Sequence, residues 1–508
     1  MASQYYPNNR AKVTASYNTD INALVSQFLG RSQDISKKLI SETTIGAMII
    51  NALIRFVIGP GLEPKASPES SILGWSTEQR NKFASSAESF FRMYAGSKDI
   101  DYYNRESFGS LQSVALRNIL TDGDTLLHRI YGTKEQSYKP MIQLLSGCWI
   151  ANPNGTMDTK EQVGGVIFDA YGREKGYCIL QTDNNLLDSY VTKTVNKYSA
   201  NGFEEFSLVG IQPRESNQVR GIPWLASVSQ DILDLEKFKI AHRTKAATQA
   251  LLTAVIKSTE DAPSAPISSV DKIRGLERKS EALPVETDTS EVQLGAGNVV
   301  ALNPGESIDM LESKTPVNSY KEFVELELSQ IGGAVSVPYE MMTQRYNSSF
   351  SSSRATITGA EKTYKVIREE FANKICAPVW EQVIDYGIRL GMVEAPGYLE
   401  GPDLYKRAVL AVSWIGPSSI VIDPTREINA HITAISNNLE PREIATRELL
   451  QMDFEEVTDM LQTEKEVLEK KGLTTGVYDV FQEKNPNEET DDTDDTDNED
   501  KEDNDSEN

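Results

Sequence analysis

Histidine and cysteine are the residue types that most often hold metals or act as nucleophiles, and here they are scattered. They stand at His128, His242, His431, Cys148, Cys178 and Cys376. The sequence has no C-x-x-C and no H-E-x-x-H, so we predict no metal site. It also lacks the G-x-x-x-x-G-K-[ST] loop that binds nucleotide phosphates and the G-x-S-x-G turn of serine hydrolases. We therefore predict no catalysis and no cofactor.

The polar residues best suited to contacting a partner follow Pro338 in a segment without a sustained period. They are Gln344, Arg345, Tyr346, Asn347, Ser348 and Ser349. Gln344, Arg345 and Asn347 can donate hydrogen bonds to phosphate oxygens, and Arg345 adds a positive charge. The serines favour turns over regular structure. An alternative is that Arg345 pairs with Glu340 or with a neighbouring subunit.

A second basic group lies on a predicted helix from Trp224 to about Leu252. Its members are Lys237, Lys239, His242, Arg243 and Lys245. It is either a functional face that contacts DNA or an adjacent helix, or a solvated face balanced by nearby acidic residues. The nearby acidic residues are Asp231, Asp234 and Glu236.

Two helices must position the polar segment. The first runs from Ser319 to about Gly333, with Ser319 and Glu322 as a capping box. An irregular segment, Pro338–Ser353, follows, and then a long helix from Arg354 to about Leu390 that Pro378 should kink. Two helices joined by a polar loop can expose that loop to a binding partner.

The rest of the chain predicts a mixture of helices and strands, and we assign Met1–Val219 to one α+β domain. The predicted helices are Ser32–Ile58, Ser76–Tyr94, with a capping box at Ser76 and Gln79, Ser107–Leu120, and His431–Lys471, with a break at Pro441. The predicted strands are Leu126–Tyr131, Ile142–Leu145, Val166–Asp169, with a hairpin turn at Ala170–Glu174, Val299–Leu302 and Ala408–Trp414.

Composition narrows the class of protein. The 508 residues carry a net charge of −24, and half of it lies in residues 485–508, which hold 13 acidic residues and one lysine. Such a tail has too few apolar residues to fold alone. A net acidic chain is not expected to bind nucleic acid tightly.

The longest apolar stretch, Ala47–Ile58, has 12 residues, which is too short to span a membrane. The widely spaced cysteines fit a reducing compartment.

Several short motifs together resemble the lambda-like family of portal proteins of tailed bacteriophages, over about Arg31 to Leu473. In order they are Arg31–Asp34, Val57–Leu62, Ser107–Phe108, Asp122–Asp124, Arg220–Leu225, Asn303–Glu306, Val337–Glu340, Tyr346–Ser349, Ser353–Ala355, Trp414–Pro417 and Ile422–Pro424. Their order and spacing carry the resemblance. The acidic tail departs from the family pattern, and nothing in Asp261–Ser290 matches it.

The resemblance implies an α+β portal-type subunit. Its expected parts are an N-terminal arm (1–30), the N-terminal part of a wing (31–222), a stem helix (223–257), a small α/β clip (258–316), a second stem helix (317–336), a tunnel loop (337–353), a long helix with the C-terminal part of the wing (354–430), a helical crown (431–480) and an acidic disordered tail (481–508).

The resemblance also implies a function: a ring, usually of twelve subunits, at one vertex of the capsid. Double-stranded DNA enters through the ring during packaging and leaves at ejection. Expected partners are the terminase large subunit, head-completion or adaptor proteins, and the major capsid and scaffold proteins, with no membrane. The location is the virion, after assembly in the host cytoplasm. In this plan the tunnel loop and the basic stem face line the channel.

Two other functions remain open from the residues alone. One is a metal-dependent nucleic-acid-processing enzyme with an acidic tail, its carboxylates brought together by folding. The other is a different ring-forming virion protein such as a head–tail adaptor, which the chain length and the long helix–loop–helix disfavour. A metal-dependent nuclease assay separates the enzyme from the portal.

Overall fold

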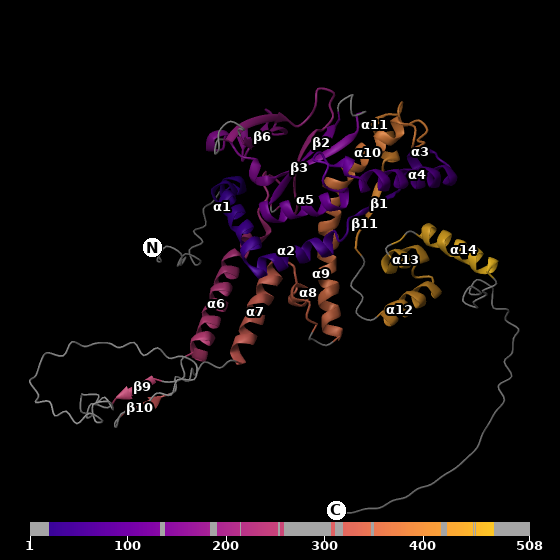
Figure 1. Ribbon diagram of the computed structural model, residues 1–508. Coiled ribbons are helices and arrows are strands. Elements are labelled where there is room, and N and C mark those ends of the chain that lie inside the picture. Colours follow the sequence, from indigo (N-terminus) through magenta and orange to yellow (C-terminus); the bar gives the residue numbers. More distant parts are fainter. Residues whose placement is uncertain are drawn as a thin grey trace, which may run out of the picture. The chain divides into compact units, whose positions relative to one another are not determined.

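The computed structural model shows two compact units, Met1–Pro424 and Thr425–Asn508 (Figure 1). The structure describes residues 20–132, 138–182, 190–213, 215–251, 255–258, 306–309, 318–346, 350–417, 424–450, 452 and 454–471. The predicted strand Val299–Leu302 and the acidic tail lie outside these residues, as does nearly all of the segment predicted as the clip.

The described residues of the first unit contain the α-helices given next. They are α1 (Ile21–Glu42), α2 (Thr44–Val57), α3 (Ser70–Leu73), α4 (Thr77–Gly96), α5 (Phe108–Asp122), α6 (Ser229–Leu251), α7 (Asn318–Ala334), α8 (Tyr339–Thr343), α9 (Phe350–Phe371), α10 (Ala377–Arg389) and α11 (Asp403–Val409). Short 3-10 turns occur at Lys98–Ile100, Gly147–Trp149, Pro153–Gly155 and Trp224–Ser227. The capping box predicted at Ser76 and Gln79 is confirmed at the start of α4.

The prediction of one helix over Ser32–Ile58 is wrong, because α1 ends at Glu42 and α2 begins after Thr43. Thr43 is extended, and its Oγ1 accepts a hydrogen bond of 3.1 Å from the N–H of Gly46. A Cβ on Gly46 would lie 2.5 Å from the carbonyl oxygen of Leu39. The break is therefore made by a cap and by a close approach that only glycine permits.

No single helix among the described residues is long and apolar enough to cross a membrane. The pair α1 and α2 passes that test by length and composition only when taken together, and the two helices are bent by 96° at the break.

Strands form four small antiparallel sheets. The first pairs β1 (Glu63–Ala66) with β11 (Val412–Ile415); the second pairs β9 (Val255–Ser258) with β10 (Glu306–Asp309). The third has the order β3 (Pro140–Ser146), β2 (Asp124–Tyr131), β8 (Phe206–Gly210); the fourth has the order β4 (Gln162–Val163), β5 (Val166–Phe168), β6 (Glu174–Thr182), β7 (Tyr190–Asn196). The predicted hairpin turn is confirmed between β5 and β6.

The region predicted as the strand Ala408–Trp414 is part helix and part strand. Ala408 and Val409 close α11, and the strand β11 begins only at Val412. Ala408 and Val409 are buried, and the apolar side chains of β11 are half-buried, so the apolar run alone could not separate the two elements.

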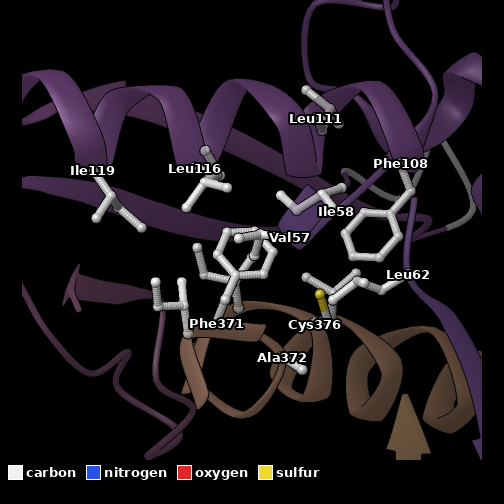
Figure 2. Packing of buried hydrophobic residues seen from close by; sticks show 14 of the residues in the cluster. Val57, Ile58, Leu62, Phe108, Leu111, Leu116, Ile119, Phe371, Ala372 and Cys376 are labelled. Carbon is white, nitrogen blue, oxygen red and sulfur yellow. The ribbon is translucent and has the colours of Figure 1, made fainter. Parts of the chain in front are cut away.

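One hydrophobic core of the first unit draws on residues from Leu39 to Leu410, so segments from both ends of this unit share it. Figure 2 shows part of it, with Leu111, Leu116 and Ile119 of α5 on one side, Phe371, Ala372 and Cys376 on the other, and Val57 and Ile58 between them. The long helices therefore share one close-packed core with the sheets. A movement of these helices relative to the sheets would require that core to repack.

The predicted long helix from Arg354 to Leu390 exists but begins earlier, at Phe350. Between α9 and α10 lies a π-helical turn, Ala372–Cys376, in which the N–H of Ala377 bonds to the carbonyl of Ala372. Pro378 follows directly, near the start of α10. The wider π turn is one way in which a helix accommodates a proline that cannot donate a backbone hydrogen bond.

The second unit contains three helices among its described residues: α12 (Pro424–Ser436), which starts one residue before the unit boundary, α13 (Arg442–Leu450) and α14 (Phe454–Lys470). The helical region and its break at Pro441 are confirmed. His431, which stands alone in the sequence, lies 2.9 Å from an Oε of Glu440. Glu448 joins them, with all three groups offering ligand atoms within 4.8 Å of one another.

Candidate functional site

The polar segment after Pro338 is more ordered than the sequence predicts. Residues 339–343 form the short helix α8, whose Met341 and Met342 are buried. Gln344 then takes a left-handed conformation, with φ of +56°, and ends the helix. Helix α9 begins at Phe350, and Asn347, Ser348 and Ser349 lie outside the described residues.

Gln344, Arg345 and Tyr346 are exposed, with Tyr346 at 44%. Arg345 forms no ion pair with Glu340 in the described part of the chain, so the alternative of an intramolecular pair is not observed. The guanidinium of Arg345 and the amide of Gln344 are free to donate hydrogen bonds outward. A bidentate donor of this kind suits phosphate or carboxylate oxygens.

Both ends of this exposed segment are anchored in the core. On one side, the hydroxyl of Tyr364 in α9 donates to the carbonyl of Ser336 at 3.0 Å, just before α8. On the other side, Ser353 and Ile357 in the first turns of α9 are each 3% exposed. The burial of Tyr364 raises its pKa well above the usual value, so this hydroxyl stays a donor.

The predicted basic stem face divides into paired and open members. Lys237 is exposed and lies 3.0 Å from Asp234. Lys239 is mostly buried and lies 3.0 Å from Glu236, which also accepts a hydrogen bond of 3.3 Å from Thr44 at the start of α2. Arg243 is exposed, and Lys245 is half-buried. Lys239 thus serves packing, and Lys237 and Arg243 are the members open to a partner.

Aromatic rings join α6 to α7. The ring of Phe238 lies 4.8 Å from Phe323 and 5.8 Å from Tyr320, and the imidazole of His242 stacks on Tyr320 at 4.1 Å. His242, counted with the basic group in the sequence, therefore belongs to this contact. The two helices form an antiparallel pair held partly by exposed rings.

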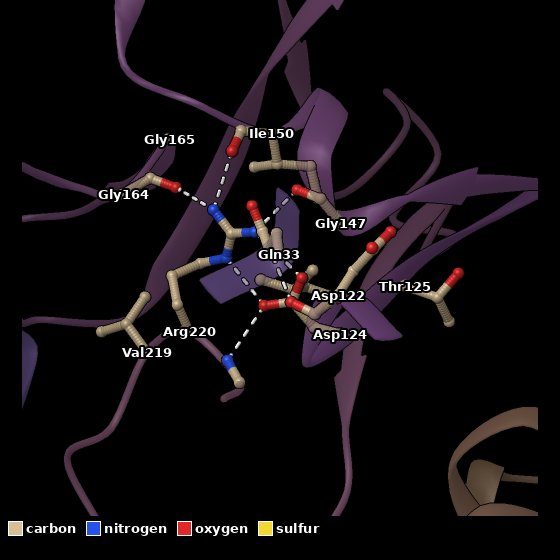
Figure 3. Close-up of polar contacts among 12 residues, drawn as sticks. Gln33, Asp122, Asp124, Thr125, Gly147, Ile150, Gly164, Gly165, Val219 and Arg220 are labelled. Atoms are coloured by element: carbon tan, nitrogen blue, oxygen red, sulfur yellow. Dashed lines mark hydrogen bonds and ion pairs between the residues drawn. The ribbon is translucent and has the colours of Figure 1, made fainter. Parts of the chain in front are cut away.

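A buried polar network lies where the chain passes from the sheets to α6, and its contacts were not predicted from the sequence. Arg220 donates to Asp124 from Nε at 2.7 Å and from Nη2 at 2.9 Å. The other N–H groups of Arg220 donate hydrogen bonds to three backbone carbonyl oxygens. These belong to Gly147, Ile150 and Gly164, with N···O distances of 2.6 to 2.7 Å. Figure 3 shows this set converging on one guanidinium group.

Burial alone would lower the pKa of Arg220, but Asp124 more than offsets it and the net pKa is raised. The guanidinium is therefore charged and fully satisfied, which a buried arginine requires. Asp122, two residues before Asp124, accepts from Ser146 and lies 3.2 Å from Lys37 of α1. Gln33 of α1 donates to the backbone carbonyl of Asp122 at 2.8 Å.

The residues after Arg220 hold the start of helix α6 in place. A Cβ on Gly221 would lie 1.8 Å from the carbonyl oxygen of Gly123, so the two glycine backbones touch. The indole of Trp224 donates to the carbonyl of Val335 at 3.1 Å, at the end of α7. The stretch Arg220–Leu225 thus ties together the β2 sheet, the start of α6 and the end of α7. Both motifs that build this arrangement, Asp122–Asp124 and Arg220–Leu225, are visible in the sequence, but nothing in the sequence pairs them.

Known phage proteins are similar to this chain over most of its length. Residues 8–368 match the family model described as "Phage portal protein, lambda family". The portal protein of Escherichia phage N15 is 21% identical over 401 residues, covering 76% of this chain and 75% of its own. Portal protein B of Escherichia phage lambda is 21% identical over 407 residues, covering 76% and 74%.

Among solved structures, a chain from the neck of an empty GTA particle aligns with a TM-score of 0.39 and 11% identity, covering 74% of this chain and 93% of its own. A chain from the virion of a native gene transfer agent particle aligns with a TM-score of 0.34 and 11% identity, covering 68% and 95%. The sequence match alone spans well over half of the protein. The chain therefore belongs to the lambda family of phage portal proteins, which are structural, non-enzymatic components of the virion.

Proposed function

We propose that this protein assembles into a ring, of twelve subunits by analogy with its family, whose axial channel carries double-stranded DNA into the capsid and out again. The exposed segment Gln344–Tyr346 is the part that meets the DNA. The observation that carries the proposal is its placement: donors that have no intramolecular ion pair stand between two buried anchors. Such a loop can touch each passing phosphate without holding it.

The net negative charge of the chain favours a channel through which DNA slides, because such a chain binds the DNA phosphates only weakly. A protein with a net charge of −24 that offers one arginine per subunit at this loop makes weak and uniform phosphate contacts. Because backbone phosphates look alike along the duplex, contacts of this kind carry no sequence preference. This is the property that a packaging channel needs.

The parts named from the family follow the same plan. We assign the antiparallel pair α6 and α7 to the stem, the segment between them to the clip, and α12–α14 to the crown. On this assignment the clip meets the terminase large subunit during packaging and a head-completion protein afterwards. Capsid and scaffold proteins contact the outer parts of the ring.

A packaging assay tests the role of the loop. The variant carrying Gln344→Ala and Arg345→Ala is compared with wild type and with Arg173→Ala, a control that removes an exposed arginine from the β5–β6 turn. We expect normal rings by electron microscopy but a changed length or poorer retention of packaged DNA. If both are unchanged in the double variant, the loop does not line the working channel.

A metal-dependent nuclease assay tests the enzyme alternative on the same purified protein. The portal assignment predicts no cleavage of duplex DNA when Mg²⁺ or Mn²⁺ is added. Cleavage that persists through purification and is lost on chelation would contradict it.

A further inference from the structure

A cavity of about 750 Å³ lies between strand β2, the residues just before β8, and helix α10. This volume is within the range of small-molecule sites in proteins. It is remote in sequence from the polar segment at Gln344, and neither the channel nor the family assignment gives it a role. The residues on its walls decide what it could hold.

Aromatic rings form much of the wall. They belong to Tyr131, Tyr138, Phe203, Tyr386 and Tyr398. Tyr131 and Tyr138 remain 38% and 56% exposed, and the ring of Tyr131 lies 5.1 Å from Phe203. Accessible ring faces of this kind attract cations through their negative quadrupole.

The positive charges of the wall are already neutralised. Arg129 lies 3.3 Å from Glu204 and covers the ring of Phe203 at 4.8 Å. Arg389 lies 2.7 Å from Asp385. An anion entering the cavity would find neither guanidinium available without breaking these contacts.

Two carboxylates of the wall make no direct contact with a cation. Within the described residues, the side chains of Glu381 and Glu205 form neither a hydrogen bond nor an ion pair. The side chain of Glu381 is exposed at the cavity, and partial desolvation by the groups around it raises its pKa against the opposing charges of Arg129 and Arg407. Beside it, the side chain of Gln382 is only 2% exposed and its Oε1 has no partner in the same set of residues.

We propose that this cavity binds an organic cation, an ammonium or guanidinium group, between the carboxylates of Glu381 and Glu205 and the faces of Tyr131 and Tyr138. The carboxylates supply charge-assisted hydrogen bonds, and the rings cover the apolar stem of the ligand. Two sources offer this chemistry. One is a lysine or arginine side chain on a protein partner, and the other is a free polyamine.

Isothermal titration calorimetry on the full-length protein tests the proposal, with two probes titrated separately. N-acetyl-arginine amide represents a protein side chain, and spermidine represents a free amine. The buffer contains about 0.15 M salt, because this screens weak attraction to exposed acidic groups such as those of residues 485–508. Binding supports the proposal only if substitution of the cavity residues weakens it.

We expect saturable binding of at least one probe, weakened about tenfold or more by Glu381→Gln and by Glu205→Gln, as loss of a charge-assisted hydrogen bond predicts. Glu42→Gln, an exposed carboxylate at the end of α1, is the matched control and should bind like wild type. Should a carboxylate variant fail to fold, Tyr138→Ala at an exposed position provides the second test, with the same expected loss.

The two probes separate the sources. Binding of the arginine derivative alone indicates a protein side chain, and binding of spermidine alone indicates a free polyamine. Absence of saturable binding by both, or binding equally strong in the cavity variants and in the Glu42→Gln control, would overturn the proposal.

Discussion

Arg220 and Asp124 form a fully buried, two-pronged ion pair, with N···O distances of 2.7 and 2.9 Å. Asp124 is the first residue of β2, and Arg220 lies just before the stem helix. Asp124 also accepts a hydrogen bond of 3.0 Å from the backbone of Gly221. The carboxylate of Asp124 thus holds Arg220 and Gly221, the residues through which the chain passes from the sheet toward helix α6.

We predict that Arg220→Lys lowers the free energy of unfolding by about 3 kcal/mol or more, as breaking a buried pair usually does. Lysine keeps the charge but cannot serve three backbone carbonyls and a carboxylate at once. Urea unfolding at a fixed protein concentration measures the loss. Arg173→Lys, at an exposed ion pair with Asp169, is the control and should change stability by under about 0.5 kcal/mol. Equal effects of the two substitutions would contradict this account.

The contact between Gly123 and Gly221 makes a second prediction. Gly221→Ala forces the two backbones apart, because its Cβ would overlap the carbonyl of Gly123. We expect a large loss of thermal stability or failure to fold. Gly359→Ala, in α9 where a Cβ meets nothing within 4 Å, should instead stabilise by about 0.5–1 kcal/mol. If Gly221→Ala melts like wild type, the close approach is not a constraint.

Local signals predicted local structure well. The capping box of Ser76 and Gln79 forms with both of its hydrogen bonds, at 3.0 and 3.2 Å. Such signals involve residues a few positions apart, whose geometry the helix itself sets. The helices on both sides of the polar segment, α7 and α9, were predicted for the same reason, but the short helix α8 inside the segment was not.

Features that depend on distant partners escaped sequence reasoning. The pair of Arg220 and Asp124 joins residues 96 positions apart. A single sequence does not state which arginine meets which carboxylate. The cavity beside Glu381 is likewise assembled from a strand, a loop and a helix that are far apart in the chain.

Asp158 gives a prediction on pH. Desolvation raises the pKa of its carboxyl, but hydrogen bonds from Ser26, the backbone of Gly164 and Asn152 outweigh this, and the net pKa is lowered. A lowered pKa in the folded state stabilises the protein above the carboxyl's usual pKa, and this is lost as pH falls through the lowered value. We expect wild type to melt higher than Asp158→Asn near neutral pH, with the gap closing in acid.

Melting curves from neutral to strongly acidic pH measure this gap. Asp403→Asn, at an exposed position in the first turn of α11, serves as a carboxyl control. A gap between wild type and Asp158→Asn that is independent of pH would mean that the hydrogen bonds of Asp158 do not depend on its charge.

The stem face gives the last prediction, because its lysines differ in environment. Lys237 and Arg243 are exposed, whereas Lys239 is 16% exposed beside Glu236. If α6 lines the channel, Lys237→Glu with Arg243→Glu should reduce DNA retention in filled heads while leaving the melting temperature nearly unchanged. Lys239→Glu should do the reverse in the isolated protein, lowering the melting temperature because two carboxylates then meet in a mostly buried site.

Melting curves and a retention assay on the same preparations separate these effects, since one reports folding and the other reports contact with DNA. The matched control is Lys321→Glu on α7, whose lysine is 71% exposed. Retention that is unchanged by reversal of Lys237 and Arg243 would show that the basic cluster is a solvated helix face. The contact with DNA would then rest on the loop at Arg345 alone, because among the predicted channel residues in the described ranges no other open cation remains.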